Sequence, residues 1–142
     1  MSAGARIAIT LVVLAAWPGA AALAVETGGG AVAASSSVAV EQGRYLAAAG
    51  NCVSCHTRPG GAPYSGGVPF VTPLGTLYST NITPDAHTGI GAWTAADLRR
   101  ALQQGSSRDG SHLFPAFPYP ALTKLSDADI AALYAFLRTV PA

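Results

Sequence analysis

The five residues Cys52-Val53-Ser54-Cys55-His56 constrain this chain more than any other segment. They follow the pattern C-x-x-C-H, which is typical of covalent haem c attachment. The two-residue spacer puts both sulfur atoms on one side of a helical turn, where each can form a thioether with one vinyl group of the porphyrin. The histidine that follows is then carried under the iron as its proximal ligand. The motif therefore predicts one haem c, bound through Cys52 and Cys55 and ligated by His56.

Other interpretations of the cysteine pair explain the segment less well. A redox-active dithiol is expected after a β-strand, but residues 43–49 have a helical composition without β-branched side chains. A structural zinc site needs four nitrogen or sulfur ligands, and only His87 and His112 remain besides the motif. We expect His87, in a polar turn, to be a solvated loop residue. A disulfide between the two cysteines would leave the adjacent His56 without a role.

The N-terminal residues have the order of features found in an export signal. Arg6 provides the positive charge, residues 7–17 are apolar, and Ala22-Leu23-Ala24 matches a small-residue cleavage site. We expect residues 1–24 to be a signal peptide, so that the mature chain begins at Val25. A retained anchor is the alternative, because residues 7–25 carry no charge and approach the ~20 residues that span a bilayer. Either outcome delivers the rest of the chain to the periplasm.

The rest of the chain divides into a linker and one domain. Residues 25–39 are rich in Gly, Ala and Ser, which predicts a flexible linker. Residues 40–142 are long enough for a single domain. The chain has 8 Lys and Arg against 7 Asp and Glu, so its composition does not indicate a nucleic-acid-binding surface.

The sequence predicts an all-α domain with three main helices and long loops. The helices are expected over about residues 40–49, 94–104 and 126–139, because each range begins or ends with recognisable capping residues. The loops are expected over residues 57–92 and 105–120, which are rich in proline and glycine. Loops of this kind can wrap around the edges of a haem.

The capping residues define the second and third helices most clearly. Thr94 is a natural N-cap and Gly105 a natural terminator of the second helix. The third helix begins at Ser126 with Asp129 at the capping-box position. Its apolar side chains recur at helical spacing; they are Ile130, Leu133, Tyr134 and Leu137.

The first and third helices are expected to cross closely. Gly43 has no side chain, and a glycine that faces an aromatic residue lets two helix backbones approach. We expect Gly43 to face Tyr134 at this crossing, with the haem beneath the two helices.

Several short segments of the chain carry a family resemblance. They are Gly43-Arg44-Tyr45-Leu46, Cys52-Val53-Ser54-Cys55-His56-Thr57, Asn81-Ile82-Thr83-Pro84-Asp85, Gly89-Ile90-Gly91, Phe114-Pro115-Ala116-Phe117-Pro118-Tyr119 and Ser126-Asp127-Ala128-Asp129-Ile130. Together they resemble the cytochrome c subunits of bacterial periplasmic dehydrogenases of the alcohol, gluconate and aldehyde type. The resemblance covers about residues 41–140. Many relatives carry three such domains in tandem, and this chain carries one.

The resemblance implies a small cytochrome c fold wrapped around a covalent haem. It implies a periplasmic electron-transfer protein, not itself an enzyme, that takes single electrons from a partner dehydrogenase subunit. The electrons would pass to a downstream acceptor of the respiratory chain, and the protein could associate with the membrane through its N-terminal segment or a partner. Tyr78, Asn81 and Ile82 would lie beside the haem propionates. A plain turn closed by Pro84 is the alternative for that segment.

The chain departs from its relatives on the distal side of the haem. Relatives commonly have a methionine ligand where this chain has Phe117, and the only methionine here is Met1. The sixth coordination position is therefore left to His112, to Lys124, to water or to no ligand. His112 is the candidate second metal ligand because it precedes the distal segment. An open iron gives an alternative function, in which the domain binds NO, CO or O₂ as a sensor or acts as a weak peroxidase.

Overall fold

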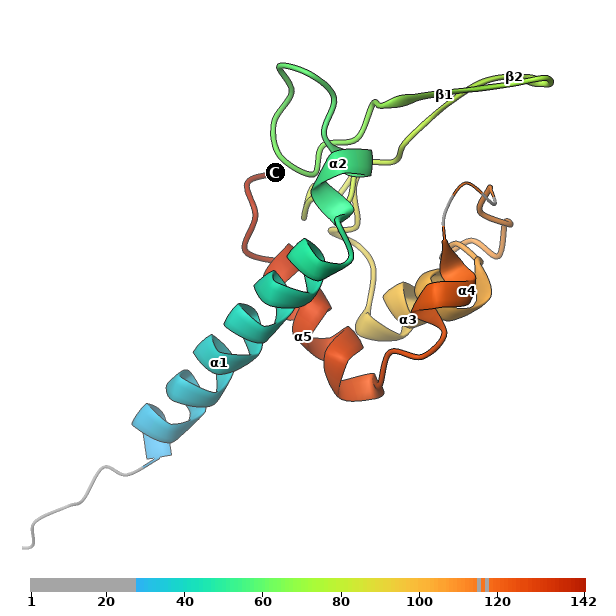
Figure 1. The fold of residues 1–142 in the computed structure, drawn as a ribbon. Helices are drawn as coiled ribbons and strands as arrows, with labels where there is room; N and C mark the ends of the chain where they lie inside the picture. Colours follow the sequence, from blue (N-terminus) through green and yellow to red (C-terminus); the bar gives the residue numbers. More distant parts are fainter. Residues whose placement is uncertain (1–27, 115, 117) are drawn as a thin grey trace, which may run out of the picture.

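The computed structural model describes residues 28–114, 116 and 118–142, and this part of the chain is mostly helical (Figure 1). The elements in chain order are α1 (Gly28–Ala49), α2 (Cys52–His56), β1 (Pro69–Thr72), β2 (Gly75–Tyr78), α3 (Ala95–Gln104), α4 (Tyr119–Leu122) and α5 (Asp127–Leu137). The three main helices are those expected from the sequence, so the predicted fold class is confirmed. The hairpin and the short helices α2 and α4 are additions to it.

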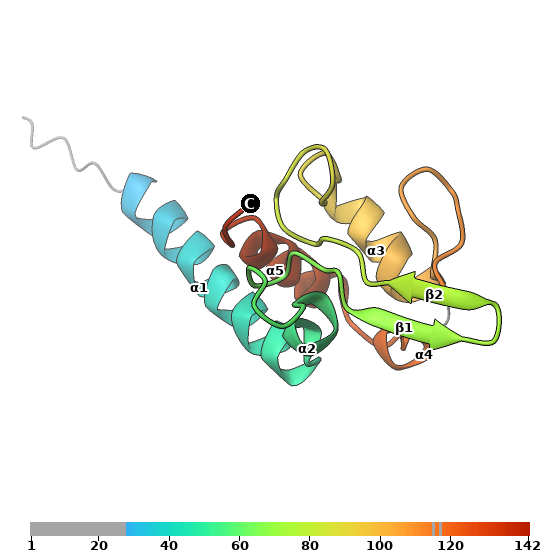
Figure 2. The ribbon, with the colours of Figure 1, turned by 90° about the horizontal axis from the view of Figure 1, so that it is seen from above.

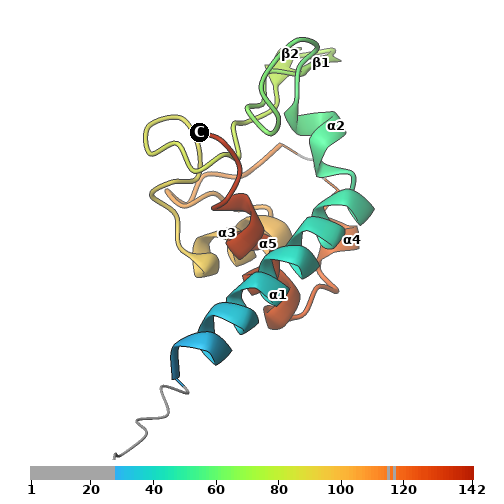
Figure 3. The same ribbon diagram turned by 90° about the vertical axis from the view of Figure 1, so that its left-hand side faces the viewer.

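The centre of the fold is the crossing of α1 and α5, which lie against each other in Figures 1 and 3. A side chain at Gly43 would overlap the carbonyl group of Ala132 and lie 2.7 Å from Cβ of Phe136. The expectation that Gly43 faces Tyr134 is therefore wrong. Residues 132 and 136 are four apart and share one face of α5, whereas Tyr134 lies two positions from each and points elsewhere.

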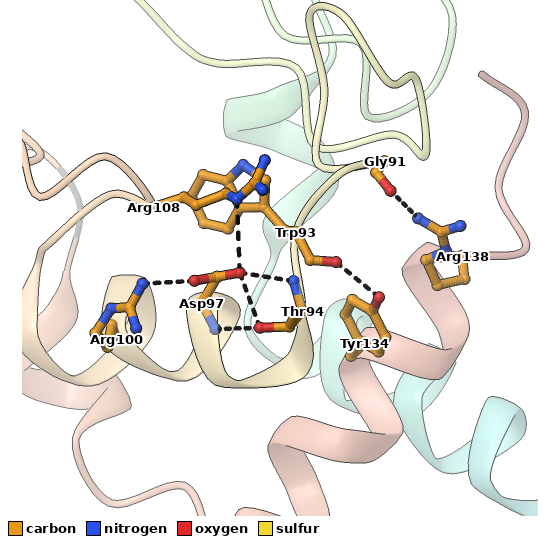
Figure 4. Close-up of polar contacts among 8 residues, drawn as sticks. All are labelled: Gly91, Trp93, Thr94, Asp97, Arg100, Arg108, Tyr134 and Arg138. Carbon is orange, nitrogen blue, oxygen red and sulfur yellow. Dashed lines mark hydrogen bonds and ion pairs between the residues drawn. The ribbon is translucent and has the colours of Figure 1, made fainter.

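The core of the domain forms where this crossing meets α3 and the loop before it. Its buried residues are Ala47, Ile90, Leu98, Leu133, Phe136, Leu137 and Val140. Ile130 is also buried, at 2% exposure, so three residues of the predicted apolar stripe lie in the interior. Tyr134, the fourth, is half-buried and donates a hydrogen bond from its hydroxyl to the Trp93 carbonyl at 2.9 Å (Figure 4).

Both predicted capping boxes are present. In α3 the Thr94 side chain accepts from the Asp97 amide while the Asp97 carboxylate accepts from the Thr94 amide, and Gly105 ends the helix with φ +64°. In α5, Ser126 and Asp129 exchange the same pair of hydrogen bonds. Asp97 also pairs with Arg100, and Arg108 lies 3.9 Å from it (Figure 4). The ion pair with Arg108 links the loop after α3 to the start of that helix.

Helix α1 begins at Gly28, well before the start expected at about residue 40. The expected flexible linker is thus helical over residues 28–39. The glycine and serine content of this segment favours a linker, but its frequent alanines are the strongest helix formers. Residues 25–27 and the expected signal peptide lie outside the described residues. Within the described part of the chain, no helix combines the length and apolarity needed to cross a membrane.

An antiparallel hairpin interrupts the long loop after α2. Strands β1 and β2 pair with Phe70 opposite Leu77 and Thr72 opposite Gly75. The turn is closed by the Thr72 hydroxyl, which donates to the Gly75 carbonyl at 2.7 Å, and Gly75 has a φ of +129° that side-chain-bearing residues rarely adopt. Figures 1 and 2 show that the hairpin extends away from α1.

Candidate functional site

The C-x-x-C-H residues form the short helix α2, directly after the C-terminal end of α1. Asn51 makes the bend between the two helices in a left-handed conformation with φ +51°. Because α2 is a single helical turn, Cys52 and Cys55 are placed three positions apart on one of its sides. Both cysteines are free thiols; Cys52 is half-buried and Cys55 is exposed. This arrangement is the one that attachment through two thioethers requires.

The imidazole of His56 is fixed by a backbone carbonyl from a distant part of the chain. Its Nδ1 lies 2.7 Å from the Thr80 carbonyl oxygen. Because that oxygen only accepts, Nδ1 carries the proton and Nε2 keeps its lone pair for a metal. Burial lowers the pKa of His56, and the hydrogen bond to Thr80 partly offsets this. The neutral ring with a free Nε2 is the form that ligates haem iron.

Two consecutive glycines pack beside the Thr80 carbonyl and hydrogen-bond to the carbonyls of His56 and Ser79. Gly66 donates from its amide to the His56 carbonyl at 2.7 Å, and Gly67 donates to the Ser79 carbonyl at 2.9 Å. Gly66 has φ +74°, and a Cβ there would lie 2.5 Å from the carbonyl oxygen of Thr80. Sequence reasoning missed Thr80 and Gly66 as parts of the site. The Gly66-Gly67 pair was the available signal, since adjacent glycines mark close backbone approach.

Tyr64 links the attachment helix to the core of the domain. Its φ of +64° is unusual for a residue with a side chain, and its amide donates to the hydroxyl of Thr57 at 3.0 Å. Its ring packs edge-to-face on Phe136 with the centroids 5.8 Å apart. Burial raises the pKa of Tyr64, and likewise the pKa of the neighbouring Cys52 thiol. The site therefore lies directly beside the α1–α5 crossing.

The other residues expected near the haem occupy a strand and the loop that follows it. Tyr78, at the end of β2, is 66% exposed. Asn81 closes its own loop, because its side chain accepts from the Thr83 amide at 2.8 Å and donates to the Thr88 hydroxyl at 2.9 Å. Ile82 is half-buried and packs against the core. Asn81 has a turn-closing role, and contact of these three residues with haem propionates stays a prediction.

The candidate distal residues lie on exposed loops. His112 is exposed and forms an isolated β-bridge with Ser106, and Lys124 is exposed after α4. His87 is exposed in the loop closed by Asp85, as expected. Phe117 lies outside the described residues. Among the residues that the structure describes, no three His, Cys, Asp or Glu side chains are grouped so as to hold a metal ion by themselves.

The attachment helix and two other parts of the chain expose apolar side chains, which suits a large apolar prosthetic group. Val53 on α2 is 40% exposed, Leu77 on the hairpin is 38% exposed and Phe114 before α4 is 45% exposed. Helix α2 itself contributes no buried residue. Two thiols, one pre-oriented imidazole and exposed apolar side chains are the donor set and surface that a covalent haem uses. The residues present therefore fit haem c.

The sequence is similar to parts of several dehydrogenase subunits. It is 55% identical over 104 residues to a subunit of the nicotinate dehydrogenase of Pseudomonas putida, a match that covers 73% of this chain and 9% of that protein. It is 52% identical over 97 residues to the gluconate 2-dehydrogenase cytochrome c subunit of Pantoea cypripedii, covering 68% and 22%. It is 48% identical over 97 residues to the cytochrome c subunit of a quinone-type alcohol dehydrogenase of Gluconobacter oxydans, covering 68% and 20%.

These relatives are much longer than the matched region. The chain spans less than a quarter of the length of each. Residues 40–141, which include α2 and all later elements of the fold, match the family model for cytochrome c. This match covers most of the chain and includes the whole of the attachment motif. The chain therefore belongs to the cytochrome c family, whose members carry covalently bound haem c.

Proposed function

We propose that this chain is an electron-transfer protein that carries one haem c, bound through Cys52 and Cys55, with His56 as the proximal ligand. The bound haem supplies one-electron chemistry through its iron. The observation that carries the proposal is the His56–Thr80 hydrogen bond of 2.7 Å beside two free thiols on one helical turn. This bond fixes the ring orientation and leaves Nε2 available. The protein thereby orients the imidazole for ligation of the iron.

The donor of the electrons is proposed to be a dehydrogenase subunit. The relatives are named as subunits of nicotinate, gluconate and alcohol dehydrogenases. These names favour electron transfer over small-ligand sensing. The periplasm is the proposed location, because the N-terminal residues resemble an export signal. The acceptor is proposed to lie further along the respiratory chain.

The attachment is tested by replacing the two thiols. Mature wild-type protein should keep one haem through acid–acetone extraction, and its intact mass should include that haem. The Cys52→Ala, Cys55→Ala double variant should release all haem under the same treatment. Ser54→Ala is the matched control, since it changes the same helical turn and keeps both thiols. Covalent haem in the double variant would overturn the assignment.

The electron-transfer function is tested by rapid-mixing absorption spectroscopy. Purified catalytic subunits of nicotinate, gluconate and alcohol dehydrogenases, and any oxidoreductase subunit encoded beside this chain, are mixed with the oxidised holoprotein and their substrate. At least one should reduce the haem fast enough to sustain turnover. Reduction by dithionite alone, with no reduction by any of these subunits, would contradict the proposed donor.

A further inference from the structure

The hairpin of β1 and β2 exposes large apolar side chains at its tip. Val71 is 84% exposed and Leu74 is 95% exposed. In Figures 1 and 2 this tip lies at the end of the molecule away from α1. Large apolar side chains that are exposed together mark sites of interaction, whereas single ones are ordinary. The tip is therefore a candidate contact surface.

The register of the hairpin separates its two faces. Val71 lies opposite Thr76, and Phe70 lies opposite Leu77. Because side chains alternate along a strand, these two pairs point to opposite faces. Phe70 is half-buried and Leu77 is 38% exposed, while Tyr78, on the same face as Val71, is 66% exposed. The more exposed side carries the strand residues Pro69, Val71, Thr76 and Tyr78. We call this side, together with the exposed turn residue Leu74, the outer face.

The outer face lies in a stretch of chain without charge. No Asp, Glu, Lys, Arg or His occurs between Arg58 and Asp85. A complementary surface must therefore also be largely uncharged and apolar. A lipid headgroup surface is disfavoured, because attraction to anionic lipids depends on clustered basic residues.

The size of the outer face argues against a stable dimer. It offers five side chains, whereas a standard protein interface uses about 20–30 residues a side. Redox encounters bury less than about 1,200 Å² and are transient. A small, uncharged apolar face thus suits a redox partner better than a second copy of this chain.

The outer face is also directly connected to the proximal histidine. Strand β2 ends at Tyr78 and continues through Ser79 to Thr80, whose carbonyl accepts the His56 hydrogen bond at 2.7 Å. We propose that the outer face is the docking surface for the dehydrogenase subunit that donates electrons, which meets it with an uncharged apolar patch. This inference rests on the proposed function. It adds the place of contact and the chemistry of the contact.

The test uses the full-length holoprotein and the dehydrogenase subunit that reduces the wild type most rapidly. Leu74→Glu places a carboxylate in the contact, and the second-order rate constant of reduction should fall by about tenfold or more, since a charge must then be desolvated. Val38→Glu is the matched control, because Val38 is 68% exposed on α1. It should leave the rate unchanged. Reduction of all three proteins by dithionite should be equal.

Several outcomes would overturn the docking surface. An unchanged rate for Leu74→Glu, or an equal loss in Val38→Glu, refutes it and leaves the proposed function intact. A wild-type rate that falls steeply with ionic strength indicates a charged contact instead. If sedimentation shows a dimer that Leu74→Glu abolishes, the outer face binds a second copy of the chain. If the wild type binds anionic vesicles and Leu74→Glu does not, the outer face binds lipid. If no dehydrogenase subunit reduces the wild type, the proposed function itself fails, and the docking surface fails with it.

Discussion

Gly43 of α1 and Ala132 of α5 are in backbone contact, and no side chain fits between them. A Cβ at position 43 would lie 2.6 Å from the carbonyl carbon of Ala132 and 2.7 Å from Cβ of Phe136. Such overlap requires the helices to move apart. In a helix without this contact, replacing glycine with alanine would be stabilising by roughly 0.5–1 kcal/mol. Whether Gly43→Ala lowers or raises the free energy of unfolding therefore shows whether Gly43 lies at the helix crossing or at an ordinary helical position.

We expect Gly43→Ala to lower the free energy of unfolding by about 1–3 kcal/mol, which is the usual cost of overpacking. Urea denaturation of the holoprotein, followed by circular dichroism, measures this directly. Ala48→Leu is the control, because Ala48 is exposed on the same helix. Its unfolding midpoint should hardly change. A more stable Gly43→Ala protein would show that the helices do not cross at this residue.

Gly66→Ala should raise the reduction potential of the haem. A Cβ at Gly66 would lie 2.5 Å from the Thr80 carbonyl oxygen and displace it from His56. Loss of that hydrogen bond makes the imidazole a weaker donor, which favours ferrous iron. Gly60→Ala is the matched control, since Gly60 has φ +72° and nothing lies within 4 Å of its Cβ. Redox titration of both variants checks the prediction.

Gly66→Ala and Gly60→Ala each also place a side chain on a residue in the left-handed region, which costs about 1–2 kcal/mol. Unfolding measurements should therefore show a loss of stability in each. Only Gly66→Ala should combine this loss with a change in potential. Equal potentials in the two variants would mean that the Thr80 carbonyl does not tune the iron.

The helices of this fold were predictable because local signals mark their ends. Thr94 and Asp97 form a capping box that follows from side-chain chemistry alone, as do Ser126 and Asp129. The partner of Gly43 was not predictable in the same way. An apolar stripe identifies the buried side of α5, but the crossing angle decides which residue on that side meets the glycine.

The sequence predicts the haem-attachment residues of the site but not the hydrogen bond that orients His56. The spacing of Cys52, Cys55 and His56 lies within one helical turn, so sequence alone specifies it. The Thr80 carbonyl is a backbone group 24 residues away from His56. Every residue has such a group, so the sequence does not indicate which one binds the imidazole. The hairpin was missed because its strands have four residues each within a Pro- and Gly-rich loop.

Tyr134→Phe should destabilise the domain without affecting haem attachment. Its hydroxyl donates to the Trp93 carbonyl at 2.9 Å and joins α5 to the residues before α3. Removing the donor leaves that carbonyl without this partner, at a cost of about 0.5–1.5 kcal/mol. Tyr45→Phe, at a residue that is 67% exposed, should be neutral in the same thermal unfolding experiment. Equal midpoints in the two variants would contradict a stabilising role for the hydrogen bond.

Protonation of the Asp97 carboxylate should lower the free energy of unfolding of the domain in acid. Hydrogen bonds from Thr94 hold the pKa of Asp97 below its ordinary value, and Arg100 lowers it further. A lowered folded-state pKa means that this stabilisation is fully present above the unfolded value of about 3.9. It is lost as the pH falls through the folded pKa.

Asp97→Asn should therefore be clearly less stable than the wild type at neutral pH, and the difference should shrink at acidic pH. Urea midpoints measured across this range test the prediction. Asp127→Asn is the control, since Asp127 makes only an exposed ion pair with Arg99 at 3.3 Å among the contacts described. A stability difference for Asp97→Asn that does not vary with pH would contradict the assigned role of the carboxylate.

The distal ligand should not be methionine, because residues 40–141 contain none. Methionine ligation raises the potential of cytochromes c, so the potential of this protein should lie below that of relatives with a His/Met pair. The ferric spectrum should lack the weak long-wavelength band of methionine–iron coordination. His112→Ala should convert a low-spin spectrum to a high-spin one that responds to CO after reduction. His87→Ala, at an exposed loop histidine, should leave the spectrum unchanged. If both variants keep the wild-type spectrum, His112 is not the ligand, and the sixth position belongs to Lys124, to water or to no ligand.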